Sequence, residues 1–306
     1  MRHLNFIDMT TWEATPEGLV RTPLPYRPLP SNYHLFFLND THVGNDAIHE
    51  GAIERFVRDV RSKKHSYVIA QGDQLETIDI GDKRYDIGCH GSRLSRYNAQ
   101  RDKFLEYFDP IGDKFLLVLD GNHERRIKNI YQPNADIAKA FNAVYAGGTM
   151  AKLLFPGWRL MSWHGWGRIN SRAGDQKQRE VNEIISLKRN LRELPAQDCD
   201  IITCGHYHKL RLHDPTKKLL LVSDAKESLL KQYYSRPTRK YIDKDQDVYV
   251  IDDEDKWFMC CGSFLRGYQE GIPSYVEDAG MAATELGYGH IEVKNDAPHA
   301  VECVKV

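Results

Sequence analysis

The chain has 306 residues, of which 41% are hydrophobic and 28% are charged. That length can bury one large core or two modest ones. The formal net charge is −1 and the pI is about 6.9. No overall positive field therefore draws the chain to nucleic acid or to a membrane, and an anionic partner would need a local basic patch.

Apolar segments and cysteines indicate where the protein works. No window of the sequence approaches the roughly 18 apolar residues that cross a bilayer. Residues 1–18 also lack the apolar segment and cleavage site of a signal peptide. The six cysteines form no C-x-x-C pair, which favours small core residues over a disulfide framework or a zinc finger. We therefore predict an intracellular, cytoplasmic protein with no membrane partner.

The first half of the chain alternates between strands and helices. Residues 1–32 contain five prolines and no hydrophobic period, so we predict an extended N-terminal arm there. Short apolar runs predict strands, and apolar residues at helical spacing predict helices. In chain order these are a strand at 34–38, a helix at 46–61, a strand at 66–70, a polar irregular stretch at about 77–93, a helix at about 97–108, a strand at 114–120 and a helix over about 137–144.

The second half consists mainly of strands. The pattern predicts a strand at 158–163, a long helix over about 175–194 and a strand at 200–204, followed by strands at 218–222, 247–251, 257–261, 290–293 and 300–306. This order favours a layered α/β protein with mixed sheets and external helices. No linker divides the chain after the arm, so we predict a single domain over 33–306 with an insert at about 209–246.

The apolar strands end, one after another, in side chains that bind metal ions. The motifs are Asp40-x-His42, Gly72-Asp73, Gly121-Asn122-His123, His164-Gly165 and Gly205-His206-x-His208. Each motif alone also fits a capped turn. Loops at the carboxyl ends of strands converge in open α/β sheets, so the whole set predicts a shared site. Its oxygen and imidazole donors suit manganese, iron or zinc better than calcium.

These motifs resemble those of the calcineurin-like metallophosphoesterases, in the style of small phage, bacterial and archaeal members. The similarity runs from about residue 34 to Gly262-Ser263-Phe264. It implies a two-layer mixed β-sandwich flanked by helices, with a dinuclear metal centre at the C-terminal ends of the strands. The resemblance further implies a ligand set in which Asp40, His42 and His208 hold one metal, Asn122, His164 and His206 hold the other, and Asp73 bridges the two.

Two departures from the family pattern are visible. Glu76 stands where the family commonly has an aspartate or asparagine three residues after the bridging aspartate. The GDxVDRG pattern of the Ser/Thr protein phosphatases is missing, which argues against that branch.

Such a centre fits the hydrolysis of phosphate esters. Two divalent cations, with manganese favoured and iron or zinc as alternatives, would bind the phosphoryl oxygens and acidify a bridging water to hydroxide. His123 is the candidate general acid that protonates the leaving oxygen. The alternative role for His123 is a hydrogen bond that orients a ligand. Arg125 and Arg126 either bind the phosphate or lie in solvent.

The segment after the last motif bears on the substrate. Residues 206–242 contain nine Lys/Arg against three acids, with tyrosines interleaved. Such a segment can follow a DNA or RNA backbone and stack its bases, or it can be a solvated face balanced by the acidic stretch 243–256. Three hypotheses follow: a phosphodiesterase on nucleic acid or nucleotides, a phosphomonoesterase on a phosphoprotein or metabolite, and a non-catalytic metal-binding module. The complete motif set disfavours the third, and the basic segment favours the first.

Overall fold

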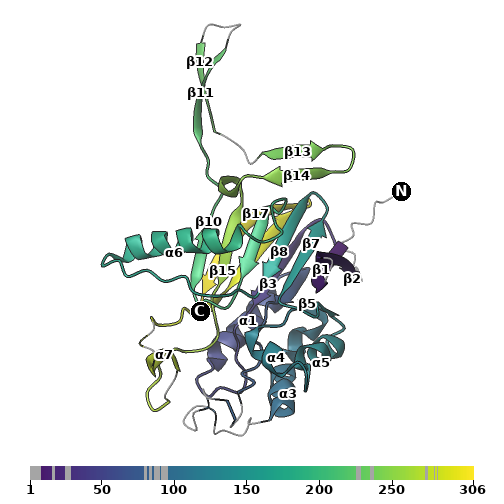
Figure 1. The fold of residues 1–306 in the computed structure, drawn as a ribbon, viewed down its shortest axis with the longest axis vertical. Helices are drawn as coiled ribbons and strands as arrows, with labels where there is room; N and C mark the ends of the chain where they lie inside the picture. The colour runs from purple at the N-terminus through teal and green to yellow at the C-terminus, as the bar shows by residue number, and fades with distance from the viewer. Residues whose placement is uncertain are drawn as a thin grey trace.

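Two β-sheets pack face to face in the computed structural model of the chain, and helices lie on their outer faces (Figure 1). The structure describes residues 8–15, 18–24, 29–78, 81–82, 85, 90, 96–224, 229–234, 238–272, 275–278, 280 and 282–306. None of the helices in these ranges is long and apolar enough to span a membrane.

The first sheet has six strands in the order β17-β16-β3-β4-β5-β6. Its central strands β3, β4, β5 and β6 are parallel, and β16 joins β3 antiparallel. The bounds are β3 Tyr33–Leu38, β4 Ser66–Ala70, β5 Phe115–Val118, β6 Val144–Tyr145, β16 Gly287–Lys294 and β17 Ala297–Lys305. Because β3, β4 and β5 run the same way, their carboxyl ends meet at one edge of the sheet.

The second sheet has seven strands in the order β10-β15-β9-β8-β7-β1-β2. Strands β8, β9 and β15 are parallel to one another, and β7 and β10 flank them antiparallel. The bounds are β1 Asp8–Thr15, β2 Gly18–Leu24, β7 Met150–Phe155, β8 Trp158–Trp163, β9 Ile201–Cys204, β10 Leu210–His213 and β15 Trp257–Cys261.

The side chains of β3 point alternately to the two faces of the first sheet, and both faces are buried. Leu35 and Phe37 point into the core between the two sheets, where they share a cluster with Leu160 and Ile201 of the second sheet. Phe36 points the other way, toward the helices. A strand covered on both faces reads as a continuous apolar run, which is why residues 34–38 show no alternation in the sequence.

Helices cover the outer face of each sheet. α1 (Glu50–Ser62), α3 (Tyr97–Phe108) and α5 (Pro133–Ala140) lie over the first sheet, where Phe56, Phe104 and Phe108 pack together. α6 (Gln176–Leu191) lies over the second sheet through Leu187 and Leu191. The remaining helical elements are short: η1 Asp109–Lys114, α4 Asn122–Ile127, η2 Asp253–Asp255 and α7 Tyr275–Asp278.

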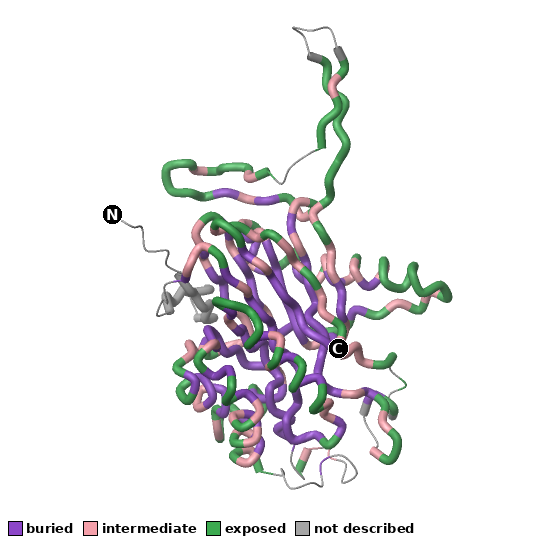
Figure 2. Tube along the Cα trace, turned by 180° about the vertical axis from the view of Figure 1, so that it is seen from behind, coloured by how far each residue is buried: buried purple, intermediate pink, exposed green. Residues whose placement is uncertain are grey.

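Two hairpins project from the second sheet, beyond the end of β10 (Figure 1). They are β11 (Leu219–Asp224) with β12 (Leu229–Tyr234), and β13 (Arg239–Asp243) with β14 (Val248–Ile251). The described residues of β11 and β12 are mostly exposed (Figure 2), and Leu221 and Leu230 are 66% and 72% exposed. The four strands carry three of the nine basic residues of the segment: Lys231, Arg239 and Lys240.

Most of the expected elements are confirmed, with differences at their ends. The helix expected over 137–144 is wrong at its carboxyl end, because α5 stops at Ala140 and Val144 already pairs with β5. Strands β6, β7, β10, β12 and β13 were not predicted. Described residues of the expected N-terminal arm form the hairpin β1–β2, which extends the second sheet beyond β7. The division into arm, domain and insert stays a prediction.

Two expectations touch residues outside the described ranges. Most of the polar stretch at about 77–93 lies outside them, as does Cys89. The other five cysteines are free thiols, four of them buried, as expected of small core residues. The intracellular, cytoplasmic location stays a prediction.

Candidate metal centre

The predicted ligands all follow strands that end at the same edge of the sandwich. In the first sheet, Asp40 and His42 follow β3, Asp73 follows β4, and Asn122 opens α4 after β5; in the second sheet, His164 follows β8, and His206 and His208 follow β9. Gln71, directly after β4, donates hydrogen bonds from Nε2 to Ser162 of β8 (2.9 Å) and Thr203 of β9 (2.8 Å). This amide fixes the two sheets to each other beside the site.

Several of these residues have a left-handed backbone. Asp40, His42, Asp73, His206 and His208 have φ between 48° and 68°. Residues with a β-carbon seldom adopt this conformation, and it clusters at functional sites where the surrounding structure enforces it. Here the sharp turn directs each side chain back across the strand ends, where the loops converge.

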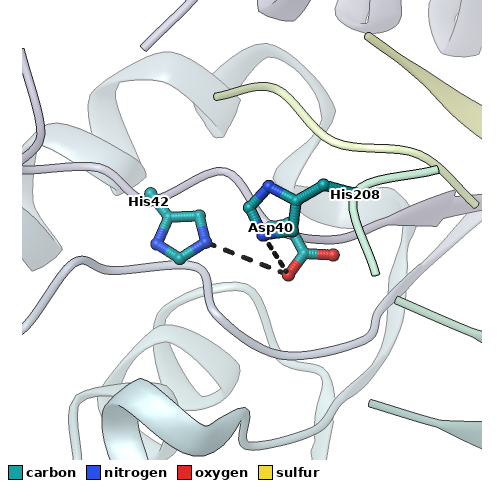
Figure 3. Close-up of side chains that lie close together, drawn as sticks. All are labelled: Asp40, His42 and His208. Carbon is teal, nitrogen blue, oxygen red and sulfur yellow. Dashed lines mark ion pairs between the residues drawn. The ribbon is translucent and has the colours of Figure 1, made fainter. Parts of the chain in front are cut away.

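Asp40, His42 and His208 form one candidate metal-binding group, with donor atoms all within 4.8 Å of one another (Figure 3). Asp40 Oδ1 lies 3.4 Å from His208 Nε2 and 3.9 Å from His42 Nε2. Asp40 Oδ2 accepts hydrogen bonds from Asn39 Nδ2 and from the backbone N–H of His206. Asp40 Oδ1 and His42 Nε2 are buried and have no hydrogen-bond partner among the described residues, as expected of atoms that hold a cation.

Asp73, His164 and His206 form a second such group. His164 Nδ1 donates to the carbonyl of Gln71 (3.0 Å), so Nε2 carries the lone pair in the neutral ring. That nitrogen lies 3.0 Å from Asn122 Oδ1 and 3.3 Å from Asp73 Oδ2. Separations of about 3 Å are those of neighbouring ligands bound at about 2.1 Å to one cation. The donor set therefore fits a divalent metal ion.

Asp73 lies between the two groups. Its Oδ2 is 3.3 Å from His164 Nε2 in the second group and 3.9 Å from His42 Nε2 in the first. Its Oδ1 accepts a hydrogen bond from the backbone N–H of His123 (2.9 Å). The position agrees with the bridging role that the family resemblance implies, and that role stays a proposal.

Charge in this site is concentrated and buried. Burial and the nearby Asp73 raise the pKa of Asp40 to about 6, although His164 opposes the rise. Burial disfavours the charged ring of His164, but Asp73 outweighs it and raises the pKa of His164 to about 9. Burial and His164 lower the pKa of His206 to about 4. No Lys or Arg among the described residues pairs with Asp40 or Asp73, so only imidazoles balance these carboxylates.

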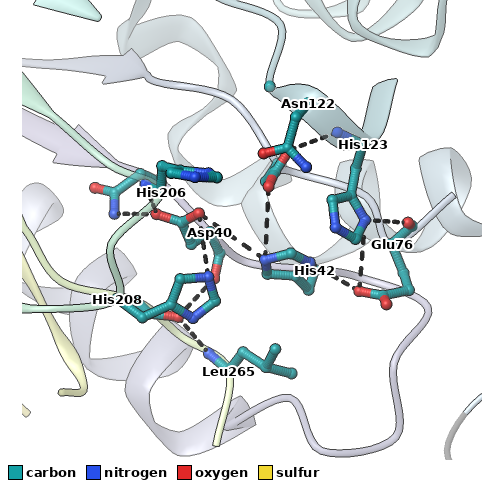
Figure 4. Close-up of polar contacts among 12 residues, drawn as sticks. Asp40, His42, Glu76, Asn122, His123, His206, His208 and Leu265 are labelled. Carbon is teal, nitrogen blue, oxygen red and sulfur yellow. Dashed lines mark hydrogen bonds and ion pairs between the residues drawn. The ribbon is translucent and has the colours of Figure 1, made fainter. Parts of the chain in front are cut away.

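Glu76 orients the rings behind the first group (Figure 4). Its carboxylate accepts from His42 Nδ1 at 2.7 Å and from His90 Nε2 at 3.0 Å. A carboxylate on the far nitrogen of a metal-binding imidazole fixes its tautomer and aims its other nitrogen at the metal. Glu76, the residue that departs from the family pattern, therefore makes a hydrogen bond that orients His42. Glu76, His42 and His123 also form a third cluster of possible ligands, but the short bond to His42 already uses one Glu76 oxygen.

Glu124, which directly follows Gly121-Asn122-His123, joins two of the motif loops, a role that was not predicted from the sequence. Its carboxylate accepts from the backbone N–H groups of Gly121 (2.8 Å), Asp73 (3.1 Å) and Leu75 (3.0 Å). Gly121 lies against the same loop: a β-carbon there would come within 2.0 Å of Asp73 Oδ1. Gly121 and Glu124 therefore hold Asp73 in place rather than bind a metal.

His123 is buried beside the first group. Its exposed fraction is 4%, and its ring centroid lies 4.7 Å from that of His42. Its Nδ1 donates to the backbone carbonyl of Glu76, which fixes the ring. The contact is consistent with both predicted roles, general acid and ligand orientation.

The turn after β15 supports the Asp40 loop from the second sheet. Phe264 N–H and the Ser263 hydroxyl both donate to the carbonyl of Asp40 at 3.1 Å. Asn39 Nδ2 donates to the carbonyl of Gly262 at 2.5 Å. Residues 262–264, where the family resemblance ends, are thus part of the frame of the centre.

Comparisons with known proteins add little to this geometry. No family model matches the chain, and no curated protein sequence matches it. Among solved structures, the crystal structure of a metallophosphoesterase from Sphaerobacter thermophilus aligns with 85% of this chain and 84% of that one, at 11% identity and a TM-score of 0.37. An overlap that loose shows nothing about the function of this protein.

Replacing Glu76 by alanine is expected to weaken manganese binding about 10- to 100-fold, because His42 loses the carboxylate that orients it. Competition with a fluorescent chelator measures the affinity. Glu193→Ala is the control, since that side chain is 77% exposed on the surface, and its affinity should equal that of the wild type. Wild-type manganese affinity in folded Glu76→Ala would show that the contact does not support a metal ligand.

Proposed function

We propose that this protein is a metal-dependent phosphoester hydrolase that binds two divalent cations, with manganese favoured, and that it acts on phosphodiesters of nucleic acid or nucleotides. The observation that carries the proposal is the convergence of Asp40, His42 and His208 with Asp73, His164 and His206 at one edge of the sandwich. Bound there, two cations would neutralise the phosphoryl oxygens and activate the attacking water.

In this proposal, each residue of the site has a separate role. Asp73 holds the two ligand groups together, and Asn122 and the imidazoles supply neutral donors that add no negative charge near the substrate. Glu76 and Glu124 keep the ligands in position through the hydrogen bonds described above. His123 delivers a proton to the leaving oxygen.

The site is also compatible with the chemistry of monoesters, because both reactions need the same ligands. The arginines that follow Asn122 in α4 favour a diester substrate. They extend the anion-binding surface beyond the phosphate that the metals would bind. The hairpins β11–β14 leave the centre along β10 (Figure 1), so the proposal places no part of the substrate on them.

The direct test is a comparison of substrates on one preparation. Metal is removed by chelation, manganese is restored, and turnover of bis(4-nitrophenyl) phosphate and 4-nitrophenyl phosphate is measured side by side. We expect activity only with metal, and faster cleavage of the diester. Faster cleavage of the monoester would replace the proposed substrate class, and metal uptake without turnover of either compound would reduce the protein to a binding module.

His123→Ala is expected to lower turnover about 10²- to 10⁴-fold, the usual contribution of a general acid, while manganese content stays at the wild-type level. Elemental analysis and initial rates on the same sample give both quantities. Unchanged turnover would remove His123 from catalysis. A joint loss of metal and turnover would instead assign His123 the orienting role.

A further inference from the structure

An open pocket of about 780 Å³ adjoins the second ligand group. Asn122, His164 and His206 form one side of it, so whatever fills the pocket touches the candidate metal centre. The larger side chains of the remaining lining are mainly aromatic and basic: Trp163, Trp166, Arg125, Arg126 and Arg168. No Asp or Glu lines it among the described residues, and an anion is the ligand that such a surface attracts.

Trp166 is held firmly by its backbone while its ring stays in solvent. The residue is 71% exposed, which is unusual for the largest apolar side chain. Its carbonyl accepts a hydrogen bond from the buried Tyr207 hydroxyl at 2.9 Å. Gly165 has φ +114°, and a β-carbon there would lie 2.7 Å from Cβ of His206. The backbone of the loop is therefore held in place, and the loop presents an exposed indole to the pocket that His206 also lines.

The arginines lie on either side of that ring in the sequence and share its pocket. Arg125 and Arg126 belong to α4, which begins at Asn122, and Arg168 lies two residues after Trp166. All three are exposed. Arg126 is 3.4 Å from Asp82, whereas Arg125 and Arg168 form no ion pair with any carboxylate of the described residues. Two guanidinium groups are thus available to bind phosphate oxygens.

An aromatic plane beside unpaired guanidinium groups is the combination that binds single-stranded nucleic acid. Bases stack on the ring whatever their identity, and the cations follow the backbone. A paired duplex offers no free base face to the indole. A monophosphate on a protein side chain offers no base and no second phosphate.

We propose that this pocket binds single-stranded nucleic acid, with one base stacked on Trp166 and a phosphate next to the scissile one held by Arg125 and Arg168. The inference rests on the proposed function for the identity of the scissile phosphate. The substrate strand then binds beside the second ligand group and not on the distant β11–β12 hairpin.

The test measures binding without hydrolysis, so that a failure of the proposed function leaves it interpretable. Fluorescence anisotropy is recorded in EDTA with a dye-labelled 12-mer of thymidylate and with an abasic strand of the same length. We expect the wild type to bind the thymidylate strand about tenfold more tightly than the abasic strand, a preference of about 1.4 kcal/mol, as expected of one stacked base.

Trp166→Ala should abolish this preference by weakening the thymidylate strand alone, and Trp166→Phe should retain most of it. Arg125→Ala and Arg168→Ala should weaken both strands and each reduce the salt slope by about one. The matched control is Tyr234→Ala, an aromatic that is 65% exposed on β12, which should change neither strand.

An unchanged preference in Trp166→Ala would overturn the proposal, and so would loss of the preference in Tyr234→Ala, which would place the bases on the hairpin. Hydrolysis of base-free phosphodiesters is scored separately. Activity on them with no base preference refutes the pocket alone, while base preference without any activity refutes the proposed reaction alone.

Discussion

Two buried carboxylates, Asp40 and Asp73, determine the arrangement of the centre. Both are almost inaccessible to water, and no Lys or Arg of the described chain pairs with either. Charge in such a place is costly unless a partner neutralises it. The imidazoles around them supply that partner only when protonated, and a bound cation supplies it while leaving the imidazoles neutral. The surrounding loops hold the carboxylates where such a cation would reach them.

The sandwich makes this arrangement possible because strands from both sheets end at one edge. Short parallel strands, closely packed on both faces, give their loops fixed starting points. Gln71 connects the two sheets at that edge, and Glu124 connects the loops after β4 and β5. The left-handed turns at the ligands are stabilised by these contacts, since isolated residues of these types would favour other conformations.

Much of this organisation could be predicted from the sequence. Apolar runs identified β3, β4, β5, β8 and β9, and the polar residues after them identified the side chains that the fold brings together. Both signals come from residues that are close together in the chain, so they are visible in the sequence. The end of α5 was missed because Val144 continues the helical spacing although it pairs with β5.

Contacts between distant loops were not predictable. Glu76 and Glu124 act through backbone positions and ring orientations that no spacing in the sequence records, so their roles were not predicted. For the basic segment, closeness in the sequence does not mean closeness in space. It follows His208 directly in the sequence, but β10 carries it away from the centre. Trp166 directly follows Gly165 in the sequence. Its exposure to solvent, which distinguishes it from a core aromatic, is visible only in the structure.

The central claim is that two cations bind between these ligand groups with Asp73 in common. Anomalous X-ray diffraction from crystals of the manganese-loaded protein tests it directly. The account predicts two peaks about 3.5–4 Å apart, one beside Asp40, His42 and His208 and one beside Asn122, His164 and His206, with Asp73 touching both. A single peak that Asp73 does not contact, or no peak at this edge of the sandwich, would contradict it.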